Sequence, residues 1–133
     1  MMYLLDTNVC IQFLNRKSRP LIEKLSSIDP DEILLCAVVK AELLYGAFKS
    51  NNPLKVLKIQ GEFFSGFKSL DFDDKSANVF GKIRSNLEKK GKIIGPYDLL
   101  IASIAIANNV TLVTHNTREF SRVEGLDYED WEE

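Results

Sequence analysis

Short apolar runs along the chain alternate with longer segments in which apolar residues recur every three or four positions. Four runs are short, apolar and bounded by turn residues, which favours buried β-strands: Met2–Leu5, Ile33–Cys36, Ser69–Phe72 and Val110–Thr114. A fifth run, Leu126–Tyr128, predicts a strand at the edge of the sheet.

The segments between these runs have the apolar spacing of amphipathic helices. Proline at a first turn and glycine after a last turn mark several of their ends. The predicted helices are Val9–Leu14, a helix beginning at Pro20, Ala37–Ser50, Leu54–Phe67, Asp73–Lys90, Tyr97–Asn108 and a short helix after Asn116. Strands that alternate with helices predict an α/β fold, in which a parallel sheet is covered on both faces. A chain of 133 residues predicts one domain spanning residues 1–133.

Composition places the chain among globular proteins, with 45% apolar and 27% charged residues. The longest nearly apolar run, Leu99–Ala107, is too short to cross a bilayer, which takes about 20 residues. The N-terminus lacks the basic region of a signal peptide. Cys10 and Cys36 have apolar neighbours and are predicted to be free core residues, so we expect a cytoplasmic protein.

The formal net charge is −2, which does not predict a general nucleic-acid binder. The charge is uneven, because Lys82–Lys92 carries a net +4 and Glu124–Glu133 carries −6. The basic segment is either a solvated helix face or a surface that attracts a polyanion locally.

Three acidic residues have unusually apolar surroundings. Asp6 follows a predicted buried strand, Glu42 lies among apolar residues of a helix, and Asp98 begins a helix that is almost wholly apolar. A carboxylate in such surroundings needs compensation. Asp6 could cap the following helix, Asp98 could interact with a helix dipole, and Glu42 could pair with a lysine of a neighbouring helix.

The alternative is a metal site, because ligands of parallel α/β sheets bind beyond the carboxyl ends of the strands. Asp6 and Asp98 are expected to face one crevice there. Converging carboxylates repel one another unless a cation neutralises them, and oxygen ligands suit Mg²⁺ or Mn²⁺. Asn116 and Glu119 have the spacing of a capping box, but either could also complete the metal shell.

Four motifs carry a family resemblance: LLDTN at 4–8, AELLYGA at 41–47, GPYDLLIA at 95–102 and THNTREF at 114–120. In this order they resemble the motifs of PIN-domain nucleases, and they are most similar to the VapC toxins of bacterial VapBC toxin–antitoxin pairs. The similarity runs nearly end to end and includes Gly125-Leu126 and residues 129–131. The resemblance implies a three-layer α/β/α domain with five parallel strands in the order 3-2-1-4-5.

The resemblance also implies roles for individual residues. Asp6, Glu42 and Asp98 match the three acidic positions that bind metal and carry catalysis. Asn116 and Glu119 both match positions near the metal, and the choice between them stays open. Thr7 and Asn8 match the polar residues that orient the first acid.

The activity implied is endonucleolytic cleavage of structured RNA with Mg²⁺ or Mn²⁺, with the anticodon loop of initiator tRNA as the first expectation. A metal-activated water would leave 5′-phosphate and 3′-hydroxyl ends. A metal-free route through the RNA 2′-hydroxyl usually needs a paired acid and base, whereas this chain has one histidine, His115. Candidate contacts to RNA phosphates are Arg118, Arg122, Lys82, Arg84 and Lys89.

The resemblance implies a homodimer and a cognate VapB-type antitoxin whose C-terminal segment lies in a groove beside the active site. Operator DNA would be bound only through the antitoxin, because this chain contains no DNA-reading motif. The phenylalanines Phe63, Phe64 and Phe67 either line that groove or pack in the core.

Two other functions are compatible with a small α/β fold that carries acids at the strand ends. A phosphoacceptor receiver domain would need paired acids after its first strand and a lysine after its last, but Asp6 stands alone and no lysine follows Val110–Thr114. A PIN-fold binding module or a DNA-directed nuclease is the other alternative, although the chain lacks the insertions needed to grip DNA flaps.

Overall fold

Five parallel strands form one sheet in the order β3-β2-β1-β4-β5. The structure is a computed structural model that describes residues 1–132. The strands are β1 (Tyr3–Leu5), β2 (Ile33–Cys36), β3 (Lys68–Leu70), β4 (Thr111–Val113) and β5 (Tyr128–Glu129). The predicted α/β fold and strand order are therefore confirmed, and each predicted strand is present with small shifts of its ends.

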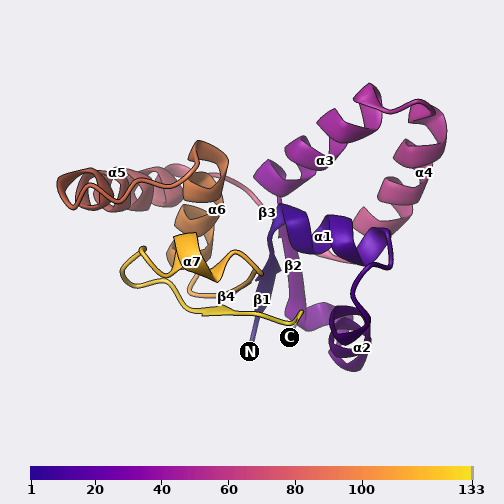
Figure 1. Cartoon of the computed structure of the whole chain (residues 1–133), viewed down its shortest axis with the longest axis horizontal. Helices are drawn as coiled ribbons and strands as arrows, with labels where there is room; N and C mark the ends of the chain where they lie inside the picture. Colours follow the sequence, from indigo (N-terminus) through magenta and orange to yellow (C-terminus); the bar gives the residue numbers. More distant parts are fainter. Residues whose placement is uncertain (133) are drawn as a thin grey trace.

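The helices are α1 (Thr7–Leu14), α2 (Arg19–Ser27), α3 (Ala37–Lys49), α4 (Pro53–Phe64), α5 (Asp74–Lys89), α6 (Pro96–Ala107) and α7 (Thr117–Phe120), with a 3-10 turn at Pro30–Glu32. In Figure 1, α1 to α4 lie on one side of β1 and β2, and α5 to α7 lie on the other. Pro20, Pro53 and Pro96 each occupy the first turn of a helix, as expected for a residue with a preset φ and no N–H.

The predicted helix Leu54–Phe67 extended too far at its C-terminal end. It ends at Phe64, and Ser65 and Gly66 turn the chain toward β3. Glycine disfavours helix continuation because it loses more backbone freedom than other residues. Phe67 therefore lies outside the helix, although it still packs against the core.

The core lies on both faces of the two central strands. Leu4, Leu5 and Leu35 are fully buried, and most of α6 is buried as well. Cys10 and Cys36 are free and buried, as predicted. No helix within residues 1–132 is long and apolar enough to cross a membrane.

The phenylalanines of α4 contribute to this core. The ring of Phe63 lies 5.7 Å from that of Phe13 and 5.3 Å from that of Phe67, measured between centroids. Phe63, Phe64 and Phe67 are half-buried against the main core. Of the two interpretations that the sequence left open, core packing describes their position.

We predict that Phe63→Ala lowers the free energy of unfolding by about 2–3 kcal/mol. This loss is smaller than the one expected for removal of a fully buried ring, because the ring of Phe63 is half-buried. Phe48→Ala is the matched control, because Phe48 is 67% exposed and should change stability by less than about 0.5 kcal/mol. Urea denaturation of both variants measures the difference. Equal losses would contradict the assignment of Phe63 to the core.

Candidate active site

Asp6 directly follows β1 and caps α1. Its side chain is 4% exposed, and its Oδ1 accepts a 2.8 Å hydrogen bond from the backbone N–H of Val9. The hydroxyl of Thr114, after β4, also hydrogen-bonds this carboxylate. Burial, more than the charges of Asp98 and Glu132, nevertheless raises the pKa of Asp6 from 3.8 to about 6. The capping role is therefore real, but it leaves the buried charge only partly compensated.

Asp98 lies in the first turn of α6, the position where a helix dipole favours an anion. This location matches the simpler of the two interpretations of the sequence. Burial above all, with smaller contributions from the charges of Glu119 and Glu42, nevertheless raises the pKa of Asp98 to about 6. Burial and the neighbouring acids together thus outweigh the favourable position in the helix.

Glu42 lies on α3 and is half-buried, where its Oε1 accepts a 2.5 Å hydrogen bond from the hydroxyl of Thr7. Thr7 therefore orients Glu42, whereas the sequence predicted that it orients Asp6. Within residues 1–132, no lysine forms an ion pair with Glu42, so the structure does not contain the lysine pairing that was the alternative to a metal site. The parallel pairing of β1 and β2 explains the contact, because the helices that follow these strands begin side by side.

Asn116 and Glu119 interact, but not as the predicted capping box. The side chain of Asn116 caps no backbone N–H of α7. Its Nδ2 instead donates a 3.1 Å hydrogen bond to Oε2 of Glu119, while its backbone N–H donates to Thr114 Oγ1 at 3.0 Å. The amide is turned toward the carboxylate rather than toward the helix, so Asn116 holds Glu119 close to Asp98.

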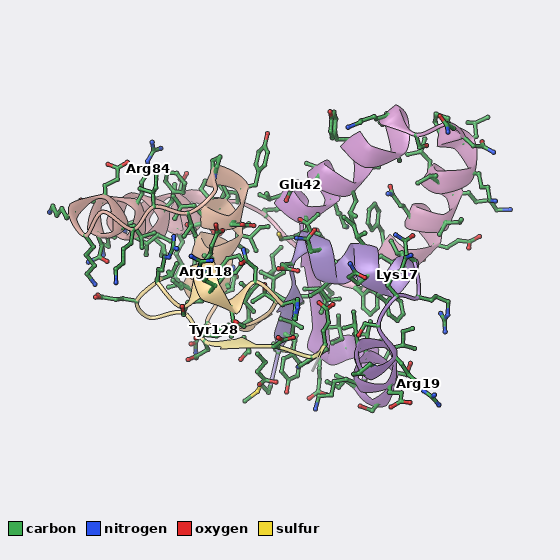
Figure 2. All side chains as sticks on the ribbon, in the orientation of Figure 1. Lys17, Arg19, Glu42, Arg84, Arg118 and Tyr128 are labelled. Carbon is green, nitrogen blue, oxygen red and sulfur yellow. The ribbon has the colours of Figure 1, made fainter. Side chains whose placement is uncertain are left out.

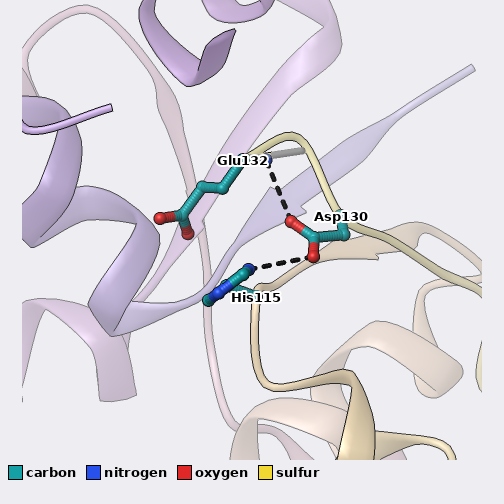
Figure 3. A group of neighbouring side chains, drawn as sticks. All are labelled: His115, Asp130 and Glu132. Carbon is teal, nitrogen blue, oxygen red and sulfur yellow. Dashed lines mark hydrogen bonds and ion pairs between the residues drawn. The ribbon is translucent and has the colours of Figure 1, made fainter. Parts of the chain in front are cut away.

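The C-terminal segment adds two acids, Asp130 and Glu132, to which the sequence analysis gave no role in the site. Nδ1 of His115 lies 2.9 Å from Oδ2 of Asp130, and the backbone N–H of Glu132 donates to Oδ1 of the same carboxylate (Figure 3). Burial raises the pKa of Glu132, whose charge in turn reaches Asp6. Trp131 anchors this segment, because its ring packs edge-on against Tyr3 with 4.9 Å between centroids.

The acidic centre, defined as Asp6, Glu42, Asp98 and Glu119, combines residues from four segments of the chain. Each of Asp6 and Asp98 experiences the charge of at least one other member. Their carboxylates face one site without forming a tight cluster. Within residues 1–132, the side chains whose ligand atoms all lie within 4.8 Å of one another are those of His115, Asp130 and Glu132. Both oxygens of Asp130 already accept hydrogen bonds, so that cluster ties the C-terminal segment to β4.

The donor set of the acidic centre fits a hard divalent cation. All of its ligands are oxygens, its carboxylates repel one another, and Mg²⁺ keeps several waters and needs few protein ligands. Oε2 of Glu132, near Asp6, is also buried and has no hydrogen-bond partner within residues 1–132. A cation at this edge would relieve the repulsion that raises the pKa values.

An open hollow of about 700 Å³, the α1–α3 groove, begins at the acidic centre and continues over an apolar surface. It is lined by Thr7, Asn8, Ile11, Ala37, Val38, Ala41, Glu42, Tyr45, Tyr97 and Leu100. Tyr45 and Tyr97 are 66% and 58% exposed, which is high for large aromatic side chains. Asn8 lies exposed in this groove, and the phenylalanines of α4 do not line it.

The basic residues of α5 do not form one surface. Lys82 and Arg84 point about 200° apart around the helix axis. Arg84 pairs with Glu88 at 3.1 Å, and Lys82 lines a different hollow together with Glu124. Figure 2 shows Arg84 on α5 and Arg118 separately on α7.

Comparison with known proteins agrees with this geometry. The family model of the PIN domain matches residues 3–126. The chain belongs to the PIN-domain family. It is 40% identical over 133 residues to Ribonuclease VapC2 of Rickettsia felis, covering 99% of each chain. It is 38% identical over 129 residues to the tRNA(fMet)-specific endonuclease VapC of Shigella flexneri, covering 97% of each.

A solved structure of VapBC2 from Rickettsia felis bound to a promoter DNA fragment contains a similar chain. The TM-score is 0.92 at 39% identity, with 98% of this PIN domain and 99% of that chain covered. The resemblance that the four motifs indicated is therefore confirmed.

We predict that Asp6→Asn stabilises this PIN domain in EDTA at pH 8 by about 1–3 kcal/mol. Asparagine caps a helix as well as aspartate does but carries no charge to bury. The gain should disappear as the pH falls from 6 to 4. Folded Asp6 has a pKa of about 6, whereas its usual value is 3.8, so on lowering the pH the folded group binds its proton first. The wild-type protein therefore gains stability as the pH falls through this window and loses it as the pH rises.

Thermal unfolding between pH 4 and pH 8 measures this effect. The control is Asp73→Asn, because Asp73 caps α5 from an exposed position where its pKa is lowered. That variant should gain no stability at pH 8. A wild-type protein that is more stable than Asp6→Asn at pH 8 in EDTA would contradict the prediction.

Proposed function

We propose that this chain is the toxin of a type II toxin–antitoxin pair and acts as a metal-dependent endoribonuclease. The observation that carries the proposal is the convergence of Asp6, Glu42, Asp98 and Glu119 at the carboxyl edge of the sheet, with the pKa of Asp6 and Asp98 raised to about 6. Relatives that match almost the full chain are named ribonucleases, which supports the same activity.

Asp6, Glu42 and Asp98 would hold Mg²⁺ or Mn²⁺, with Glu119 as the fourth carboxylate. When bound, the cation acidifies water and neutralises the charge that develops on the phosphate. The neighbouring side chains fix the ligands: Thr7 holds Glu42 and Asn116 holds Glu119. Asn116 therefore supports a ligand, and Glu119 is the better candidate of the two for the metal shell.

His115 is not needed for the cleavage step in this proposal. Its side chain is 59% exposed and its Nδ1 faces Asp130, on the side of the C-terminal segment. Attack by water instead of the RNA 2′-hydroxyl leaves 5′-phosphate and 3′-hydroxyl ends. The proposed substrate is structured RNA, with initiator tRNA first because the Shigella flexneri relative is named tRNA(fMet)-specific.

The α1–α3 groove is the proposed binding site for a VapB-type antitoxin in the cytoplasm. It is lined by exposed side chains that are largely apolar, including Ile11, Tyr45 and Tyr97. The carboxylate of Glu42 lines the same groove. A peptide segment with apolar anchors and one cationic side chain would complement both features. We also propose a homodimer, and binding of operator DNA through the antitoxin. The Rickettsia felis VapBC2 complex was solved bound to a promoter DNA fragment, which supports DNA binding by the pair.

We predict that Asp98→Asn lowers the rate of RNA cleavage by at least about 100-fold, because a lost metal ligand costs several kcal/mol of transition-state stabilisation. Purified protein is incubated with total tRNA in Mg²⁺, in Mn²⁺ and in EDTA, and the new ends are sequenced. Asp73→Asn should cut like the wild type. Products with 2′,3′-cyclic phosphate ends, or cutting that persists in EDTA, would refute the proposed chemistry.

The same assay distinguishes the alternative functions. Cleavage of single-stranded DNA but not of any RNA would favour a DNA-directed nuclease. Binding of RNA without cleavage in either metal would favour a PIN-fold binding module.

We predict that Tyr45→Ala weakens antitoxin binding at least tenfold, since an exposed tyrosine in a groove is a typical binding anchor. Phe48→Ala is the matched control, because Phe48 is equally exposed on α3 but does not line the groove. The partner is a VapB-type antitoxin, and Kd is measured by calorimetry. Equal effects of the two variants would argue against the groove.

A further inference from the structure

A second hollow, the α7 hollow, shares no lining residue with the α1–α3 groove. Its volume is about 530 Å³, and it is lined by Gly91, Lys92, Ile93, Arg118, Ser121 and Arg122. Residues three and four apart share one face of a helix, so α7 and its helical extension present Arg118, Ser121 and Arg122 together. The loop between α5 and α6 forms the other wall.

The charges of the α7 hollow are all positive. Lys92, Arg118 and Arg122 line it without an acidic residue, and no carboxylate within residues 1–132 forms an ion pair with any of them. Two nearby bases are neutralised, since Arg84 pairs with Glu88 and Lys90 with Glu124. The α7 hollow thus retains its capacity to bind an anion.

One of these bases is held in place by the fold. Nη1 of Arg122 donates a 2.9 Å hydrogen bond to the backbone carbonyl of Ile93. This bond uses one of the five N–H donors of the guanidinium. Arg122 therefore links α7 to the loop before α6, and Arg118 and Lys92 are the more exposed bases of the hollow.

The α7 hollow adjoins the acidic centre. Arg118 immediately precedes Glu119, so their Cα atoms are about 3.8 Å apart. The Glu119 side chain lies near Asp98 and bonds to Asn116, whereas Arg118 lines the hollow. Successive side chains of a helix point about 100° apart, which explains how one short helix presents an acid to one site and a base to the next.

We infer that the α7 hollow binds the phosphodiester backbone of the RNA substrate beside the bond that is cut. This inference rests on the proposed ribonuclease function. Guanidinium groups bind phosphate oxygens through paired hydrogen bonds, and a polyanion that approaches four carboxylates needs a positive surface next to them. Arg118 and Lys92 bind the substrate, and Arg122 positions the hollow.

The test uses Arg118→Ala, Lys92→Ala and the double variant, with Lys55→Ala as the matched control because Lys55 is exposed on α4 and does not line the hollow. Binding of a fluorescein-labelled initiator tRNA transcript is measured in an Asp98→Asn background over a series of salt concentrations. Cleavage kinetics are measured with the wild-type acids in place.

We expect each single variant to weaken tRNA binding several-fold and the double variant at least tenfold. The slope of log Kd against log salt should fall by about 1 for each base removed. In cleavage, KM should rise while kcat changes less than twofold, and Arg118→Lys should recover part of the affinity. Lys55→Ala should behave like the parent protein.

Unchanged tRNA affinity in the double variant, or an equal loss in Lys55→Ala, would overturn the assignment of the α7 hollow while leaving the nuclease in place. A loss with duplex DNA of the same sequence but none with tRNA would overturn RNA as its occupant. If the parent protein neither binds nor cuts tRNA, the proposed function fails, and this inference fails with it.

Discussion

The position of β1 in the middle of the sheet determines where the chemistry of this protein can occur. β1 pairs in parallel with both β2 and β4, so the residue after it meets the ends of both neighbours. That residue is Asp6, which is buried, caps α1 and receives a hydrogen bond from Thr114 beyond β4. Glu42 is brought to this point by α3, which follows β2, and Asp98 by α6, which precedes β4. Glu119 comes from α7, which follows β4.

The burial of several carboxylates at one site is electrostatically unfavourable, and this explains why the site suits a cation. A carboxylate buried among other carboxylates is disfavoured, and the raised pKa values of Asp6 and Asp98 express that cost. The hydrogen bonds from Val9, Thr7 and Asn116 orient the acids but add no positive charge. The buried acids therefore lower the free energy of unfolding at the edge of the sheet where we propose that a cation binds. Such a loss of stability is common at functional sites.

The sequence predicted the elements and the three principal acids, because both follow from local patterns. Strand and helix positions follow from apolar periodicity, and Asp6 stands out as an acid after a buried run. Strand order does not follow from periodicity and came from the family resemblance. The contact of Thr7 with Glu42 was missed because it depends on the pairing of β1 with β2.

Glu132 and Asp130 were missed for a related reason. They lie in an acidic tail that resembles a solvated terminus, and only the packing of Trp131 on Tyr3 brings them to the site. The capping box at Asn116 was wrong because its spacing is satisfied equally by a side-chain contact to Glu119. Local motifs therefore fixed which residues are near one another along the chain, but not which atoms they bond.

The two surfaces beside the acidic centre differ in a way that the net charge conceals. One is apolar and ends at Glu42, which suits a peptide; the other is basic and begins next to Glu119, which suits a polyanion. A protein with a net charge of −2 has little long-range attraction for RNA, so a local positive field must supply it. Both surfaces adjoin the acidic centre, one at Glu42 and the other at Glu119. A cationic side chain of a peptide bound on the apolar surface could therefore reach the acids and compete with the metal or the phosphate, without covering the basic surface. Inhibition by such a partner would therefore depend on the acidic centre that lies between the two surfaces.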